Sequence, residues 1–205
     1  MSETPAPARF LALGDSYTIG EGAAPAERWP MQLAARLRAD GVAVADPEIV
    51  AVTGWTVAEL DAGLDAADPQ GPFDVVTLLI GVNDQYRGHE LDGYRAAYRA
   101  MLARAVGLAG DDAGRVVAVS VPDWGVTPFA QGDRRTPAEI AAEVNAVNAA
   151  ARAEAEAAGA AWVDVTALSR TQGAWVVGDG LHPSGEAYHA WADRIEPAVR
   201  AALAR

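Results

Sequence analysis

Short apolar runs alternate with segments of helical periodicity along the chain. Five runs rich in Val, Ile or Leu and bounded by Gly, Pro or Asp predict strands at 9–13, 48–52, 74–80, 115–121 and 161–165. The run at 74–80 is nearly continuous in apolar side chains, which is typical of a strand covered on both faces in a parallel sheet.

Three helical stripes lie between or after these runs. The clearest begins at Thr136-Pro137-Ala138-Glu139, a capping box with proline in the first helical position, and Gly159 is its predicted end. Its apolar face comprises Ile140, Val144, Val147 and Ala151. A second stripe comprises Tyr94, Tyr98, Met101, Leu102 and Ala105. A third, with Ser184 as its predicted cap, comprises Tyr188, Trp191, Ile195 and Val199.

This alternation predicts an α/β fold, a three-layer α/β/α sandwich around a mostly parallel five-stranded sheet. A chain of 205 residues suits one domain, which we expect at 9–205 after a disordered, proline-rich tail at 1–8. The tail lacks the apolar core of a secretory signal, so we expect a cytoplasmic protein. A signal removed before residue 1 is the alternative.

The amino-acid composition excludes several kinds of catalytic chemistry and disfavours some partners. The chain has no cysteine, which excludes disulfides and thiolate catalysis, and no lysine, which excludes Schiff-base chemistry. A net charge of −12 disfavours a nucleic-acid partner. No run approaches the roughly 18 apolar residues of a transmembrane segment. We therefore expect a small-molecule ligand; nothing in the sequence indicates the oligomeric state.

Four polar segments follow predicted strands or precede the last helix. They are Asp15-Ser16, Thr53-Gly54-Trp55-Thr56, Gly81-Val82-Asn83-Asp84 and the loop that carries Asp179 and His182. Loops at the carboxyl ends of parallel strands converge on one edge of the sheet, where α/β folds bind ligands. A serine, a histidine and an aspartate on such loops are the parts of an activated hydroxyl nucleophile.

The set of motifs resembles the SGNH, or GDSL-type, esterase and acylhydrolase family. The matching blocks occur in the family's order, at Gly14-Asp15-Ser16-Tyr17, Gly54, Gly81-Val82-Asn83-Asp84 and Asp179-Gly180-Leu181-His182. Tyr17 replaces the leucine of the family's name, and the second block lacks the asparagine that often precedes its glycine. The resemblance implies a flavodoxin-like SGNH hydrolase fold and a GDSL-type esterase or lipase that needs no metal or cofactor.

These residues have specific roles in such an enzyme. Ser16 is the expected nucleophile, His182 the base that takes its proton, and Asp179 the acid that orients the imidazole. The resemblance implies that the N–H groups of Ser16 and Gly54 and the side-chain amide of Asn83 form the oxyanion hole. Relatives cleave lysophospholipids, thioesters, aryl esters or sugar acetyl groups, so the substrate, a small acyl or a lysophospholipid-type ester, stays open.

Other residues near these loops have structural interpretations. Asp15 is expected to bond its own loop backbone, and Asn83-Asp84 has the alternative of capping a following helix. His89 and His189 are expected at the surface. The loop 121–129 is the predicted substrate wall. One or two of the nearby aromatic residues are expected to line an acyl pocket: Trp55, Tyr86, Trp124, Phe129 and Trp175.

Two other function classes stay open from the residues alone. A metal-dependent phosphoesterase could draw ligands from Asp15, Asn83, Asp84, Asp179 and His182, although only His182 is a well-placed histidine. A non-catalytic α/β binding module is the other, because a fold does not guarantee chemistry.

Overall fold

A parallel sheet of five strands forms the centre of the protein in the computed structural model, which describes residues 6–205. The strands are β1 (Phe10–Gly14), β2 (Glu48–Ala51), β3 (Val75–Leu79), β4 (Val116–Val119) and β5 (Ala161–Val163). Their spatial order is β2-β1-β3-β4-β5, and every pair is parallel. The predicted α/β class is confirmed, and each predicted strand is present with no end shifted by more than two residues.

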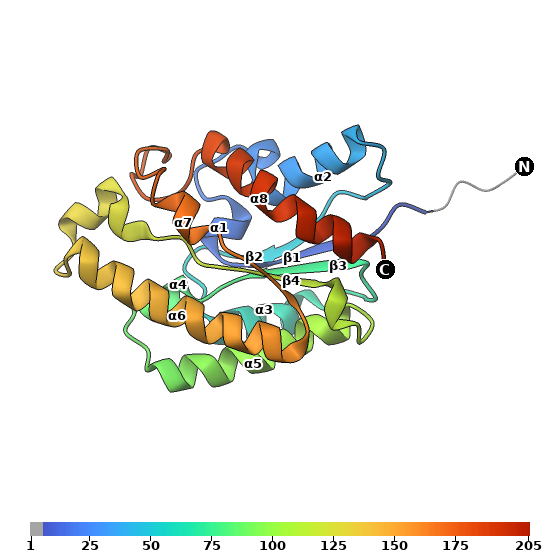
Figure 1. Cartoon of the computed structure of the whole chain (residues 1–205), viewed down its shortest axis with the longest axis horizontal. Coiled ribbons are helices and arrows are strands. Elements are labelled where there is room, and N and C mark those ends of the chain that lie inside the picture. Colours follow the sequence, from blue (N-terminus) through green and yellow to red (C-terminus); the bar gives the residue numbers. More distant parts are fainter. Residues whose placement is uncertain (1–5) are drawn as a thin grey trace, which may run out of the picture.

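Helices cover both faces of this sheet (Figure 1). On one face lie α2 (Trp29–Ala39) and α8 (Gly185–Leu203), which pack together, and on the other α3 (Val57–Ala67), α5 (Leu91–Leu108) and α6 (Pro137–Ala158). The short helices α1 (Ser16–Ile19), α4 (Val82–Tyr86) and α7 (Thr166–Ser169) lie at one end of the sheet. Single turns of 3₁₀ helix occur at η1 (Pro25–Glu27), η2 (Ala113–Arg115), η3 (Trp124–Val126) and η4 (Pro128–Gly132).

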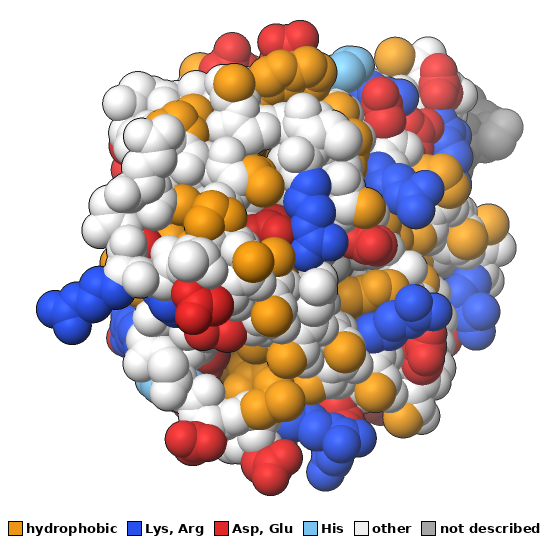
Figure 2. Space-filling model, turned by 60° about the vertical axis from the view of Figure 1, so that its left-hand side comes forward, with side chains coloured by type: hydrophobic (Ala, Val, Ile, Leu, Met, Phe, Trp, Pro, Cys, Tyr) orange, Lys and Arg blue, Asp and Glu red, His pale blue; other side chains and the backbone are white. Residues whose placement is uncertain are grey.

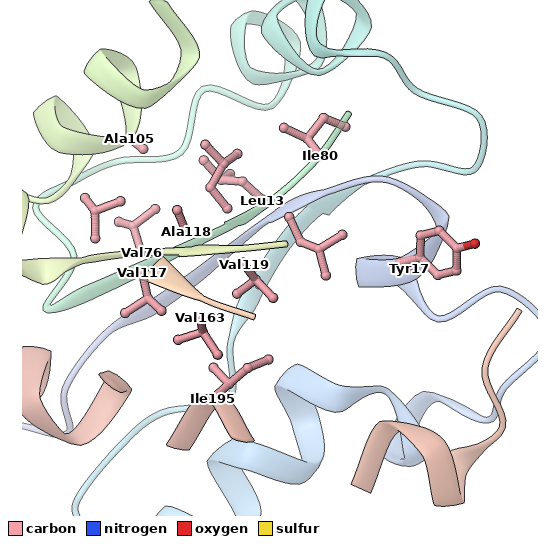
Figure 3. Close-up of a cluster of buried hydrophobic side chains, with 14 of the residues drawn as sticks. Leu13, Tyr17, Val76, Ile80, Ala105, Val117, Ala118, Val119, Val163 and Ile195 are labelled. Carbon is pink, nitrogen blue, oxygen red and sulfur yellow. The ribbon is translucent and has the colours of Figure 1, made fainter. Parts of the chain in front are cut away.

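The core is built by the predicted stripes. Figure 3 shows Ala105 of α5 on one side of the strands and Ile195 of α8 on the other. All five residues of the α5 stripe and all four of the α8 stripe are buried. The Thr136 capping box is also confirmed, with Glu139 Oε2 2.7 Å from the Thr136 N–H and Gly159 as the left-handed C-cap. Local sequence signals thus set where these helices begin, end and face.

The N-terminal boundary differs from the prediction. Residues 1–5 of the predicted tail lie outside the described residues. Ala8 pairs with Val44 in an isolated parallel bridge, and its N–H donates to the Ala43 carbonyl at 2.8 Å. The backbone therefore joins the fold one residue before the predicted start at 9.

Charged side chains of both signs are interspersed over the face shown in Figure 2. Ion pairs bridge neighbouring helices; Arg104 of α5 contacts Asp61 and Asp65 of α3 at 2.6 and 2.8 Å. This mixing keeps a strongly acidic chain free of a single-sign field on that face.

Candidate active site

Ser16 is the first residue of α1 and follows strand β1, which lies between β2 and β3, after the single residue Asp15. Gly14 makes this turn possible, because a Cβ there would lie 2.5 Å from the Leu79 carbonyl oxygen of the adjacent strand and against the Thr18 side chain. Asp15 caps α1, with Oδ1 accepting the Tyr17 N–H at 3.0 Å. The Ser16 N–H, by contrast, donates no hydrogen bond within residues 6–205. A free N–H at a helix N-terminus suits an incoming negative oxygen.

Asp15 is fully buried beneath this turn. Its Oδ1 bonds the loop backbone as expected, whereas its Oδ2 has no hydrogen-bond partner. Burial raises the pKa of Asp15 to about 7, against the opposing effect of the Tyr17 N–H, and the nearby Asp84 carboxylate adds to the rise. Asp15 is therefore an orienting residue that resists ionisation.

His182 and Asp179 form a close pair on the loop before α8. Nδ1 of His182 lies 2.6 Å from Oδ2 of Asp179, while Oδ1 accepts the N–H groups of Leu181 and His182 at 2.8 and 3.0 Å. Partial burial works to raise the pKa of Asp179, but these hydrogen bonds, with that of the imidazole largest, outweigh it and hold the pKa below its usual value. Asp179 is thus an ionised carboxylate that fixes the ring of a buried histidine.

Gly54 lies on the loop after β2 and Asn83 in helix α4, and these two segments contact each other. Gly54 has a positive φ of 87°, which favours glycine, and its carbonyl accepts from Arg87 Nη2 at 2.5 Å. Asn83 Nδ2 donates to the Trp55 carbonyl at 2.9 Å. An amide has two N–H donors, so the second stays available to a ligand. In the part of the chain that the structure describes, the Gly54 N–H donates no hydrogen bond.

Asp84 does not cap a following helix, which was the alternative role suggested for Asn83-Asp84. Helix α4 begins at Val82 with Gly81 as its N-cap, so neither Asn83 nor Asp84 caps it. Asp84 Oδ2 instead accepts the N–H of Val57, the first residue of α3, at 3.0 Å, and Oδ1 lies 3.2 Å from His89 Nδ1. Burial raises the pKa of Asp84, while the Val57 N–H and His89 oppose the rise. Its role is to tie α4 to the start of α3.

A cavity of about 160 Å³ brings four of the five predicted site residues together: Ser16, Gly54, Asn83 and His182. The fifth, Asp179, lies behind the His182 ring. The remaining lining residues are Tyr17, Thr53, Val82, Tyr86, Trp124, Phe129 and Leu181. Thr53, Val82 and Leu181 had no chemical signal in the sequence; each neighbours a motif residue and is recognisable only by that position.

Three of the five candidate aromatic residues line the cavity, and two do not. Tyr86, Trp124 and Phe129 line the cavity, and the last two confirm the loop 121–129 as one of its walls. Trp55 packs over Gly63 instead, and Trp175 lines a smaller adjacent space that shares Tyr17, Trp124 and Leu181 with this cavity. His89 and His189 both lie at the surface, where His189 Nδ1 contacts Gln32 Oε1 at 3.1 Å.

Within residues 6–205, no three or more His, Asp or Glu side chains gather in an arrangement that could hold a metal ion. The same residues include no helix long and apolar enough to cross a membrane.

The chain is similar to known proteins in its sequence profile and in its fold. The profile of the GDSL-like lipase/acylhydrolase family matches residues 12–190. No curated protein sequence matches the chain. Among solved structures, TesA is similar with a TM-score of 0.74 at 21% identity, over 95% of this chain and 99% of TesA.

Two further esterase structures share the fold. The psychrotrophic esterase EstA from Pseudoalteromonas sp. has a TM-score of 0.69 at 17% identity, over 96% of this chain and 99% of EstA. The acetylxylan esterase Axe2 from Geobacillus stearothermophilus has a TM-score of 0.69 at 19% identity, over 97% and 96%. The chain belongs to the GDSL-like lipase/acylhydrolase family and is a carboxylic ester hydrolase of the serine hydrolase type.

Proposed function

We propose that the protein cleaves carboxylic esters through an acyl-enzyme formed on Ser16, with His182 as general base and acid and Asp179 as the orienting carboxylate. One observation carries the proposal: Ser16 and His182 line the same cavity, and Asp179 Oδ2 lies 2.6 Å from the opposite ring nitrogen. The remaining parts follow from how this pair works on an ester.

The contact with Asp179 decides which imidazole nitrogen acts. An ionised carboxylate accepts a hydrogen bond, so the neutral ring keeps its proton on Nδ1 and presents an unprotonated Nε2. Nε2 takes the Ser16 proton as Oγ attacks the ester carbon, and Asp179 stabilises the imidazolium that forms. The imidazolium then protonates the departing alcohol. Water, activated in the same way, releases the carboxylic acid and restores Ser16.

The negative oxygen of the tetrahedral intermediate needs donors directed at it. We assign this role to the N–H groups of Ser16 and Gly54, which have no acceptor among the described residues, and to the second N–H of Asn83 Nδ2. Loss of one such donor typically costs about 3 kcal/mol of transition-state stabilisation.

Ser16→Ala tests the proposal. The variant should keep the circular dichroism of the wild type but lose turnover of p-nitrophenyl butanoate and labelling by a fluorophosphonate probe. His182→Ala should lose turnover too, whereas His189→Ala, at an exposed histidine away from the cavity, should not. A folded Ser16→Ala protein that still cleaves the ester would overturn the assignment.

A further inference from the structure

One side of the cavity beside Ser16 is a wall of three aromatic rings. Tyr86 comes from α4, while Trp124 and Phe129 come from the segment after β4. Trp124 is buried, and Tyr86 and Phe129 are half-exposed at the rim, at 47% and 42%. We call these three residues the aromatic wall.

The rings of the aromatic wall contact one another. Tyr86 and Trp124 meet edge to face with ring centres 5.4 Å apart, and Trp124 and Phe129 do so at 6.1 Å. The Tyr86 and Phe129 ring centres are 6.4 Å apart. Edge-to-face contacts of this kind stabilise aromatic pairs beyond the area that they bury, so each ring restrains the other two.

Polar and charged side chains outside the cavity contact the aromatic wall. Trp124 Nε1 donates to Gln85 Oε1 at 2.9 Å, and Gln85 Nε2 donates to Glu143 of α6 at 2.6 Å. The Arg135 guanidinium lies 5.5 Å from the Tyr86 ring centre and 5.1 Å from that of Trp124, within cation–π range. Arg135 is itself held by Asp133 and Glu143. Trp124 is therefore held by a hydrogen bond and by Arg135, and Tyr86 by Arg135, so these two rings do not move aside readily for a larger group.

The size and polarity of the cavity define what it can accept. The cavity opens to solvent at the rim formed by Tyr86 and Phe129, and its volume of about 160 Å³ is close to that of an enclosed apolar cavity of about 150 Å³ that binds benzene. The lining residues include no Asp, Glu or Arg. A charged group placed there would lose its hydration without a partner, whereas an apolar group would be buried favourably.

We propose that the aromatic wall restricts the enzyme to esters with an uncharged acyl group no larger than about a phenyl ring. Acetyl, butanoyl and benzoyl groups fit this description, and octanoyl or longer chains do not. The inference rests on the proposed function, because the acyl group remains bonded to Ser16 in the intermediate and must occupy the space beside it. The alcohol leaves past His182, which protonates it.

A series of p-nitrophenyl esters tests the size limit. For the wild type, kcat/KM should be similar for acetate, butanoate and benzoate and should fall at least about tenfold for octanoate, since single methylenes that do not fit a pocket can cost this much. Tyr86→Ala and Phe129→Ala shorten rim residues, so both variants should fold and should raise the octanoate-to-butanoate ratio. Leu91→Ala, which shortens an apolar side chain exposed to 42% at the start of α5 and outside this cavity, should leave the ratio unchanged.

Fluorophosphonate labelling of Ser16 in the same samples separates the two proposals. The size limit alone would be overturned if the probe labels Ser16 but the enzyme cleaves octanoate as fast as butanoate. It would also be overturned if the probe labels Ser16 but neither Tyr86→Ala nor Phe129→Ala changes the octanoate-to-butanoate ratio. If the probe does not label Ser16 and the probe-treated enzyme still cleaves the esters at the untreated rate, the assignment of Ser16 as nucleophile is overturned.

Discussion

Asn83 Nδ2 donates a hydrogen bond to the Trp55 carbonyl at 2.9 Å, so the amide assigned to the oxyanion hole also holds the loop that carries Gly54. The next residue, Asp84, accepts a hydrogen bond from the N–H of Val57, the first residue of α3, where that loop ends. Two consecutive residues of α4 therefore position two of the three proposed donors relative to each other. The Gly54 and Asn83 parts of the proposed oxyanion hole are therefore held together by direct hydrogen bonds.

Asn83→Ala should affect both catalysis and stability. We expect kcat to fall by about 100-fold, because one donor is lost, and the melting temperature to fall because the Trp55 carbonyl loses its partner. Steady-state kinetics and thermal unfolding measure the two effects. Asn145→Ala, at an asparagine that contacts Arg170 away from the cavity, is the matched control and should keep the wild-type kcat. Equal kcat values in the two variants would contradict the assignment.

Asp179→Asn should retain the fold and lose most of the activity, by up to about 10⁴-fold in kcat, because the amide can no longer impose the required imidazole tautomer. The pKa of Asp179 is lowered in the folded protein, so its ionisation stabilises the fold above the ordinary aspartate range and this contribution is lost as the pH falls through the lowered pKa.

Denaturant unfolding of the wild type and of Asp179→Asn should therefore differ at pH 7 and converge in acid, below about pH 4. A difference that grows on acidification would show that the carboxylate is not stabilised by its contacts.

Asp15→Asn should change how stability depends on pH. The folded-state pKa of about 7 exceeds the unfolded value of about 3.9, so the folded state binds the extra proton between these values and the wild type loses stability as the pH rises through this window. Asparagine keeps an oxygen for the Tyr17 N–H and cannot ionise. Urea unfolding at pH 4.5 and pH 8 should show the variant gaining stability relative to the wild type at the higher pH. Parallel profiles would show that Asp15 ionises without cost.

Gly14→Ala should destabilise the protein by about 1–3 kcal/mol or prevent folding, because the new methyl group overlaps the Leu79 carbonyl and the Thr18 side chain. Gly107→Ala is the contrasting control. It lies in α5 with no heavy atom within 4 Å of the added carbon and should gain about 0.5 kcal/mol. Chemical denaturation of both variants measures the difference, and similar changes in the two would refute the steric account.

Several features of the fold could be predicted from short segments of the sequence. The five strands, the buried stripes of α5, α6 and α8 and the Thr136 capping box follow from side-chain periodicity and from cap chemistry within a few residues. The same pattern at Thr56-Val57-Ala58-Glu59 marks the start of α3, where Thr56 and Glu59 form a second capping box. The order of the motifs along the chain also indicated the family.

The arrangement of the site depends on contacts between distant segments. The strand order β2-β1-β3-β4-β5 brings the loops after β1, β2 and β3 side by side and places the loop that carries His182 against them. The sequence around Asp84 suggested that it caps a following helix. Its carboxylate instead accepts a hydrogen bond from the N–H of Val57, 27 positions earlier, on another helix. Likewise, ring contacts join Tyr86, Trp124 and Phe129 into the aromatic wall, although these residues lie far apart in the sequence.

The sequence by itself determined which segments are strands and helices, where the helices of the core face, and which residues are available for chemistry, because these depend on backbone geometry and on neighbours a few positions apart. The tertiary structure decided which of those residues meet, how large the space beside Ser16 is and which carboxyl groups are buried. These properties arise from packing over the whole chain and have no signature within any one segment.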